Sequence, residues 1–112
     1  MAIAYDSNSI TVYRTGSRKK TIYLSENDTI RLSVHYDKAF PAGSVLTVTW
    51  ATAIDGNTDV TLASQTDTLL ASEIYLTAAD GTDNARTVVK CTAVSDSGET
   101  LTVSFDIYHT LN

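Results

Sequence analysis

Four segments of this chain alternate apolar and polar residues with a period of two, and this alternation constrains the fold more than any other feature. In residues 100–107 every second side chain is apolar, from Leu101 to Ile107, and the side chains between them are Thr, Ser or Asp. Successive side chains of a β-strand point to opposite faces, so the pattern predicts a strand with one buried face. The same reasoning predicts strands over 29–36, 45–50 and 88–93, and weaker patterns predict four more over 10–13, 21–24, 60–62 and 73–77.

Turn-forming residues separate these segments. Pro41-Ala42-Gly43, Asp55-Gly56-Asn57, Asp80 to Asn84 and Ser95 to Gly98 each stand between two predicted strands. Residues 69–74 predict a short helical turn capped by Thr68 or Ser72. Seven or eight short strands at this spacing predict an all-β, two-sheet antiparallel β-sandwich, with a small barrel as the alternative.

Composition limits the organisation of the chain to one domain. Its 112 residues, 43% hydrophobic and 19% charged, suit a single soluble domain with one core. Cys91 is the only cysteine, so no intrachain disulfide forms. The N-terminus has no basic start followed by an apolar run of signal-peptide length, and no segment has the apolar length that crosses a bilayer. We expect a complete small gene product that folds in a reducing cytoplasm and does not bind membranes.

Charge is divided unevenly along the chain. Residues 1–20 carry four basic residues against one acid, a net charge of +3, whereas residues 21–112 carry four against twelve, a net charge of −8. An acidic body argues against nucleic acid as the ligand, because Lys and Arg supply the affinity for phosphates. We therefore divide the chain into an N-terminal arm or first strand, 1–20, and the sandwich proper, 21–112.

The basic cluster of the arm has two interpretations. It is either a solvated loop or charged edge that prevents strand addition, or an arm that docks onto an acidic protein surface. Tyrosine is frequent in interface hot spots because it offers apolar area and a hydroxyl group. The candidate partner-binding residues are accordingly Tyr5, Tyr13, Arg14, Arg18, Lys19 and Lys20.

No group of residues in the sequence has the pattern of a catalytic or metal site. Cys91 lies on the apolar face of its strand and is expected in the core, and His35 and His109 lie on the opposite, solvated faces of theirs. The runs Asp55, Asn57, Asp59 and Asp80, Asp83, Asn84 are typical of turns and do not match a calcium loop. We expect no enzyme, no metal and no cofactor.

Two segments resemble the immunoglobulin-like domains. Val45 to Trp50 resembles strand C, which carries a Trp, and Val88 to Val94 resembles strand F, which carries a Cys. Leu32 or Val34 stands where an inter-sheet disulfide needs its second Cys, and Val89 replaces the tyrosine of the tyrosine corner. The chain is thus similar to the disulfide-free immunoglobulin-like domains of bacteria and bacteriophages.

This resemblance implies a binding function. A free-standing domain of this type, without an export signal, is expected to be an accessory capsid protein, a decoration or cement protein that binds the major capsid protein lattice in a virion assembled in the host cytoplasm. Other virion proteins or a second copy of this chain are further expected partners. A phage tail or head–tail component is one alternative. A carbohydrate-binding or adhesin module that uses Tyr23, Tyr75 and Tyr108 is the other.

Overall fold

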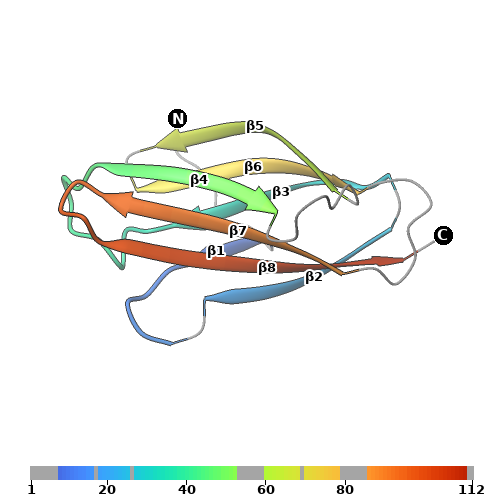
Figure 1. Cartoon of the computed structure of the whole chain (residues 1–112), viewed down its shortest axis with the longest axis horizontal. Coiled ribbons are helices and arrows are strands. Elements are labelled where there is room, and N and C mark those ends of the chain that lie inside the picture. The colour runs from blue at the N-terminus through green and yellow to red at the C-terminus, as the bar shows by residue number, and fades with distance from the viewer. Residues whose placement is uncertain are drawn as a thin grey trace.

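The computed structural model describes residues 8–16, 18–25, 27–52, 60–68, 70–78 and 86–110, with the side chains of residues 86, 109 and 110 excepted. The described residues form eight strands in two packed sheets and no helix (Figure 1). The sandwich architecture that the alternation predicted is confirmed. The strands are β1 (Ser9–Thr11), β2 (Lys19–Ser25), β3 (Thr29–His35), β4 (Leu46–Thr52), β5 (Val60–Thr68), β6 (Ala71–Ala78), β7 (Arg86–Ser95) and β8 (Thr100–Thr110).

The order of the strands is that of an immunoglobulin-like domain. One sheet has the order β1-β3-β6-β5 and the other the order β2-β8-β7-β4. Strands β3 to β8 therefore take the places of strands B to G, with B, E and D in one sheet and C, F and G in the other. This places the two N-terminal strands at the edges of opposite sheets.

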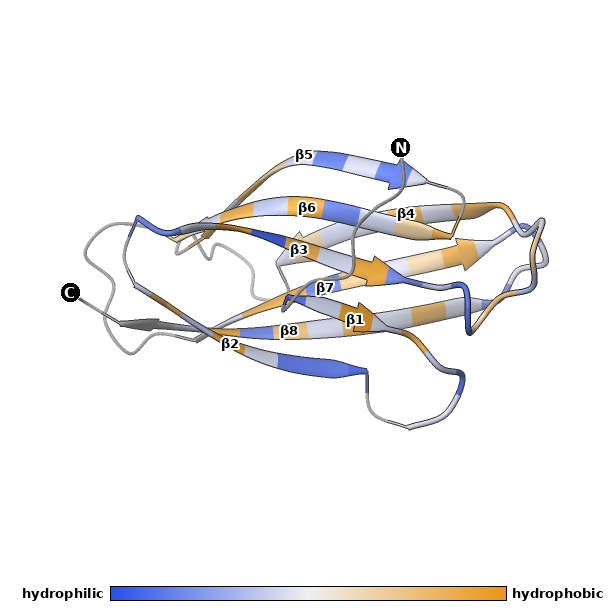
Figure 2. Ribbon diagram, turned by 180° about the vertical axis from the view of Figure 1, so that it is seen from behind, coloured by the Kyte–Doolittle hydropathy of each residue, from blue (hydrophilic) through white to orange (hydrophobic). Residues whose placement is uncertain are grey.

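Both N-terminal strands pair in parallel with their neighbours, which corrects our expectation of purely antiparallel sheets. β1 runs parallel to β3, with Ile10 opposite Val34, and β2 runs parallel to β8, with Ile22 opposite Ile107. The chain reverses its direction between the end of β1 at Thr11 and the start of β2 at Lys19 (Figure 2). The partners in these two pairs are not joined by a hairpin, and a connection through other elements permits parallel pairing. The boundary that we drew after residue 20 falls inside β2.

The core lies between the two inner faces, as the alternation predicted. Phe105 of β8 is fully buried and stacks on Trp50 of β4, with 5.9 Å between the ring centroids. Val12, just after β1, is also fully buried, so the N-terminal segment packs into the same core. Burying a large apolar side chain of this kind contributes about 1.5–3 kcal/mol. The other fully buried residues include Leu32, Val34, Leu76, Val89, Val103 and Ile107.

Polar contacts occupy the region where antibody-type domains carry their disulfide. Trp50 and Cys91 are cross-strand partners on β4 and β7, and the hydroxyl group of Tyr36 lies 3.2 Å from the Cys91 thiol. The indole Nε1–H of Trp50 donates to Ser72 Oγ at 2.8 Å, and this hydroxyl donates to Asp67 Oδ1 at 2.5 Å. Because Trp50 belongs to one sheet and Ser72 and Asp67 to the other, these bonds join the two layers.

Two predictions about local structure are wrong. The helical turn that we predicted over 69–74 does not form, because Ala71 to Ile74 belong to β6 and Thr68 of β5 pairs with Ala71. His35 is not a surface residue: it is 3% exposed, and Thr11 of β1 pairs beside it on β3. The local pattern assigns this face of β3 to solvent, but both Ser33 and His35 on it are buried. The side chain of His109 and the runs 55–59 and 80–84 lie outside the described residues.

Candidate binding surface at the loop end

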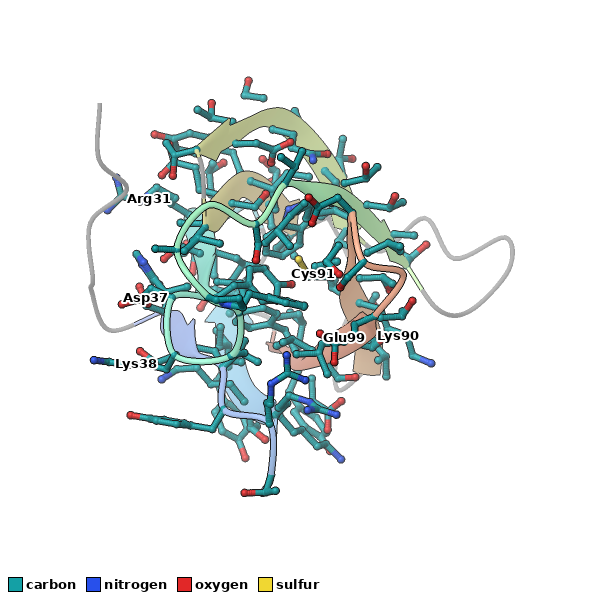
Figure 3. All side chains as sticks on the ribbon, turned by 90° about the vertical axis from the view of Figure 1, so that its left-hand side faces the viewer. Arg31, Asp37, Lys38, Lys90, Cys91 and Glu99 are labelled. Carbon is teal, nitrogen blue, oxygen red and sulfur yellow. The ribbon has the colours of Figure 1, made fainter. Side chains whose placement is uncertain are left out.

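Three connections meet at one end of the sandwich. They are residues 12–18 between β1 and β2, residues 36–45 between β3 and β4, and the turn 96–99 between β7 and β8 (Figure 1). Figure 3 looks onto this end and shows Asp37, Lys38 and Glu99 on it. In immunoglobulin variable domains the B–C and F–G loops, which correspond to two of these connections, carry the binding residues. Side-chain and backbone contacts hold the three connections together.

Arg14 fixes the first connection to the third. Its guanidinium group donates to both carboxylate oxygens of Glu99, at 2.7 and 2.8 Å, and lies 5.6 Å from the centre of the Phe40 ring. Such a two-point arrangement is the most specific that Arg forms with a carboxylate. The hydrogen bond from Arg14 lowers the pKa of the Glu99 carboxyl group and raises that of the guanidinium group. Arg14 thus contacts both of the other connections.

The turn of the first connection depends on Arg18 and Gly16. The guanidinium group of Arg18 donates to the backbone carbonyls of Tyr13 and Arg14, at 3.3 and 3.4 Å. Gly16 has a φ of 93°, a conformation that L side chains rarely adopt and that allows the chain to reverse here. Arg18 is therefore bonded to the backbone of its own loop.

Backbone hydrogen bonds fix the other two connections to each other. The Asp96 N–H donates to the Val45 carbonyl at 2.9 Å, and the Asp96 carboxylate accepts the Val45 N–H at 3.4 Å. The Tyr36 carbonyl accepts the N–H groups of Ala39 and Phe40, both at 3.0 Å, which closes a tight turn under Arg14. The three connections therefore form one preorganised surface.

The structure separates the candidate residues of the sequence analysis into two groups. Tyr13, Arg14 and Arg18 lie together in the first connection, and Tyr13 is 56% exposed. Lys19 and Lys20 lie on β2, where Lys19 Nζ is 3.0 Å from the almost buried carboxylate of Asp106. Tyr5 lies outside the described residues.

Ion pairs change the electrostatic character of the cluster. Arg14 pairs with Glu99 and Lys19 with Asp106, and both acids are more than 80 residues away in sequence. The loop end also carries Asp37 and Lys38 at its surface (Figure 3). Its charge is therefore mixed, and the basic stretch of the sequence is not a uniformly positive surface.

Val45 is an exposed apolar residue of this surface that is not among the candidates predicted from the sequence. Val45 is 63% exposed, and the bonds of its backbone to Asp96 hold it in place. The sequence does contain a signal for this exposure. Val45 directly precedes Leu46, the first apolar residue of β4, so the alternation assigns Val45 to the outward face of the strand. Within the described residues of the three connections, Tyr13 and Val45 are thus the exposed large apolar side chains, and Val94, near the end of β7, is 40% exposed.

The exposed tyrosines do not form one platform. Tyr23 of β2 is 72% exposed and stacks on Tyr108 of β8, with ring centroids 5.4 Å apart and the planes 24° apart. Tyr75 lies on β6 in the other sheet. The three residues that we considered as sugar platforms therefore divide between the two outer faces.

Cys91 is a core residue, as expected. Its thiol is fully buried, and desolvation raises its pKa to about 12, so it is protonated at neutral pH. The described residues contain no cluster of three His, Cys, Asp or Glu side chains placed to hold a metal ion. No helix long and apolar enough to cross a bilayer occurs in this part of the chain.

Comparisons with known proteins identify similar folds at low sequence identity. No family model and no curated protein matches the chain. The 2,6-sialyltransferase of Photobacterium sp. JT-ISH-224, in a ternary complex with CMP and lactose, aligns with 95% of this chain and 19% of its own, at 10% identity and a TM-score of 0.55. A nucleoside hydrolase-related protein from Saccharophagus degradans, associated with carbohydrate metabolism, aligns over 83% and 22%, at 11% identity and a TM-score of 0.56.

The M1 domain of titin aligns over 87% of this chain and 91% of its own, at 14% identity and a TM-score of 0.43. The chain spans only about a fifth of the two longer proteins. At such identities the likeness to those two shows the fold alone.

Proposed function

We propose that this protein is a binding module that attaches through its loop end to a protein surface, and that it serves as an accessory component of a bacteriophage virion. The observation that carries the proposal is the preorganised loop end, where Tyr13 and Val45 are exposed on loops joined by Arg14–Glu99 and Val45–Asp96. A surface that is already ordered loses little conformational entropy when it binds.

The composition of the loop end favours a protein partner. Tyr13 supplies apolar area and a hydroxyl group, which is the combination enriched in hot spots. Exposed charges of both signs, among them Asp37 and Lys38, lie on the same end and provide polar surroundings (Figure 3). The partner therefore needs an apolar pocket with mixed charges around it rather than a strongly acidic face.

The virion assignment has two supports. One is the resemblance of the sequence to disulfide-free immunoglobulin-like domains of phages. The other is the way in which the sheets are joined: Trp50, Ser72 and Asp67 link them through hydrogen bonds, and the single thiol stays reduced and buried. Such a core forms in a reducing cytoplasm, where virions assemble. Many weakly bound copies on a lattice stabilise a shell by mass action.

The test is quantitative mass spectrometry of purified particles from a phage that carries this gene. The proposal predicts that the protein co-sediments with particles, in hundreds of copies for a decoration protein and in few for a tail or head–tail component. Absence of the protein from purified particles would contradict both.

Two variants locate the attachment face. Tyr13→Ala is expected to weaken particle binding by roughly thirtyfold, which corresponds to about 2 kcal/mol for a hot-spot tyrosine. Tyr75→Ala is the matched control, because Tyr75 is also an exposed tyrosine but lies on β6, away from the loop end. Equal binding of the two variants to particles would refute the loop end as the attachment face.

A further inference from the structure

The outer edge of β2 carries backbone groups that its own sheet does not use. β2 pairs with β8 from Lys19 opposite Ser104 to Ser25 opposite Thr110, and Ser104 N–H donates to the Arg18 carbonyl at 2.9 Å. In a parallel ladder every second residue of a strand bonds to the same neighbour, so the bonds to β8 come from Lys20, Ile22 and Leu24. The N–H and C=O groups of Thr21 and Tyr23 therefore point away from β8.

Ser25, which has the same orientation as Thr21 and Tyr23, confirms this assignment. Its N–H donates to the Asp28 carboxylate at 3.0 Å and its carbonyl accepts the Asp28 N–H at 3.2 Å, so the turn after β2 uses both groups. Among the strands that the structure describes, β8 alone pairs with β2. Lys19, at the charged start of the strand, has the same orientation. Beyond it, the edge presents a short stretch of two donors and two acceptors on Thr21 and Tyr23.

The opposite side of the sandwich, formed by β4 and β5, is interrupted on both strands. Gln65 Nε2 of β5 donates to the Val48 carbonyl at 3.0 Å and so occupies an acceptor at the edge of β4. The edge of β5 is interrupted between Ala63 and Thr66 by a bulge in which Ser64 has a φ of 59°. Bulges and covering side chains are established devices against edge-to-edge association.

The edge of β2 is protected only at its start. Lys19 and Lys20 are charged, but the Lys19 ammonium group already pairs with Asp106 on the face of its own sheet. From Thr21 to Tyr23 the strand carries no charge, and Tyr23 is the most exposed of the large apolar residues described. The two sides of the sandwich thus differ in their capacity to pair.

We infer that β2 pairs antiparallel with β2 of a second copy of this chain, about a two-fold axis that passes beside Ile22. In this register Thr21 lies opposite Tyr23 of the second copy and exchanges both backbone hydrogen bonds with it, and the symmetric pair does the same. The four bonds consume all the backbone groups that Thr21 and Tyr23 present at the edge. A two-fold interface of this kind is self-complementary, as an isologous contact requires.

The charges and rings at the edge suit the same arrangement. The antiparallel direction places the basic start of one β2, with Arg18 and Lys19, beside the Asp28 turn of the other copy, and keeps the two basic starts apart. One face of the Tyr23 ring stacks on Tyr108, with 5.4 Å between the ring centroids, and its other face is directed toward the second copy. In the dimer, the Tyr23–Tyr108 pairs of the two copies lie diagonally across the interface and extend the stack. The two four-stranded sheets become one continuous sheet.

The mass of the full chain in solution tests this inference, measured by sedimentation velocity over a range of protein concentrations. We expect a concentration-dependent dimer. Thr21→Pro removes an N–H that points outward and no bond to β8, so the variant keeps its fold by circular dichroism but dimerises at least ~10-fold more weakly. Thr21→Ala, which keeps the N–H, is the matched control and remains a dimer.

Cross-linking tests the register. Because the Cys91 thiol is buried, cysteines introduced at positions 21 and 23 are the ones available for oxidation. A mixture of Thr21→Cys and Tyr23→Cys is expected to form a disulfide between unlike copies, since the two positions face each other at a separation that disulfides tolerate. Either variant alone is expected to cross-link far less.

A wild-type chain that stays monomeric at millimolar concentration would overturn the inference. So would a dimer that Thr21→Pro leaves unchanged, or a disulfide yield that does not depend on mixing the two variants. None of these measurements requires a virion, so their outcome is independent of the proposed attachment to particles.

Discussion

Substitution of Ser72 by Ala tests whether hydrogen bonds join the two sheets where other immunoglobulin-like domains use a disulfide. Ser72 is fully buried on β6; its hydroxyl group accepts the Trp50 Nε1–H and donates to Asp67. Ser72→Ala removes both bonds and opens little space, because only one oxygen atom is lost. The effect on stability therefore reports the polar contacts rather than a cavity.

The two lost bonds have unequal consequences. Trp50 is only 8% exposed, so its indole N–H is left buried without an acceptor, at a cost of about 1–3 kcal/mol. Asp67 lies on the exposed edge strand β5, where water replaces the hydrogen bond from Ser72. The loss of this second bond therefore adds little to the cost in stability. We expect the free energy of unfolding to fall by about 2 kcal/mol, which lowers the urea midpoint by about 1 M.

Urea unfolding followed by the fluorescence of Trp50, the only tryptophan, measures this change. Ser104→Ala is a control on the outer face of β8 and should change stability by no more than about 0.5 kcal/mol. In a Trp50→Phe background, which lacks the indole N–H, Ser72→Ala should cost about 1 kcal/mol less, as followed by circular dichroism. Equal costs in the two backgrounds, or a Ser72→Ala variant as stable as the control, would refute the argument.

Two further predictions follow from the pKa values. Burial raises the pKa of the Cys91 thiol to about 12, so it should not react with a disulfide reagent at pH 8 in the native protein. In urea it should react fully. A fast reaction of the native protein would show that the thiol is accessible. The hydrogen bond from Arg14 lowers the pKa of the Glu99 carboxyl group in the native protein. The pair therefore stabilises the fold fully above the pKa of this carboxyl group in the unfolded chain, about 4.3. This contribution is lost as the pH falls through the lower, native pKa. Thermal unfolding of Glu99→Gln should therefore differ from wild type at pH 6 and converge with it at pH 2, whereas a constant difference would contradict the pairing.

The period-two alternation in the sequence was sufficient to predict the strands that have one buried face and the residues that form the core. Leu32 and Val34 on β3, and Val103 and Phe105 on β8, lie inside as the pattern requires, because burial on one face of a strand needs only local information. The edge strand β5 was underestimated, since its polar residues after Leu62 do not alternate and its bulge shifts the register. A strand that is exposed on several sides does not produce the pattern.

Contacts between distant segments could not be predicted from the sequence. The Arg14–Glu99 pair joins residues 85 apart, and neither this pair nor the pairing of Lys19 with Asp106 follows from local composition. His35 lies on the face of β3 that the alternation assigns to solvent, yet it is buried in the folded chain, where β1 pairs beside it. The candidate residues could thus be chosen from their residue types alone. Which of them lie together at the loop end could be learned only from the folded structure.

Electron cryo-microscopy of particles with and without this protein tests most directly the claim that the loop end is an attachment face. We predict additional density repeated on the capsid surface, with the end that carries Tyr13 and Val45 against the shell and the opposite end of the sandwich pointing outward. Particles whose density does not change when the protein is present, or a domain attached through a sheet face with Tyr13 in solvent, would contradict the account.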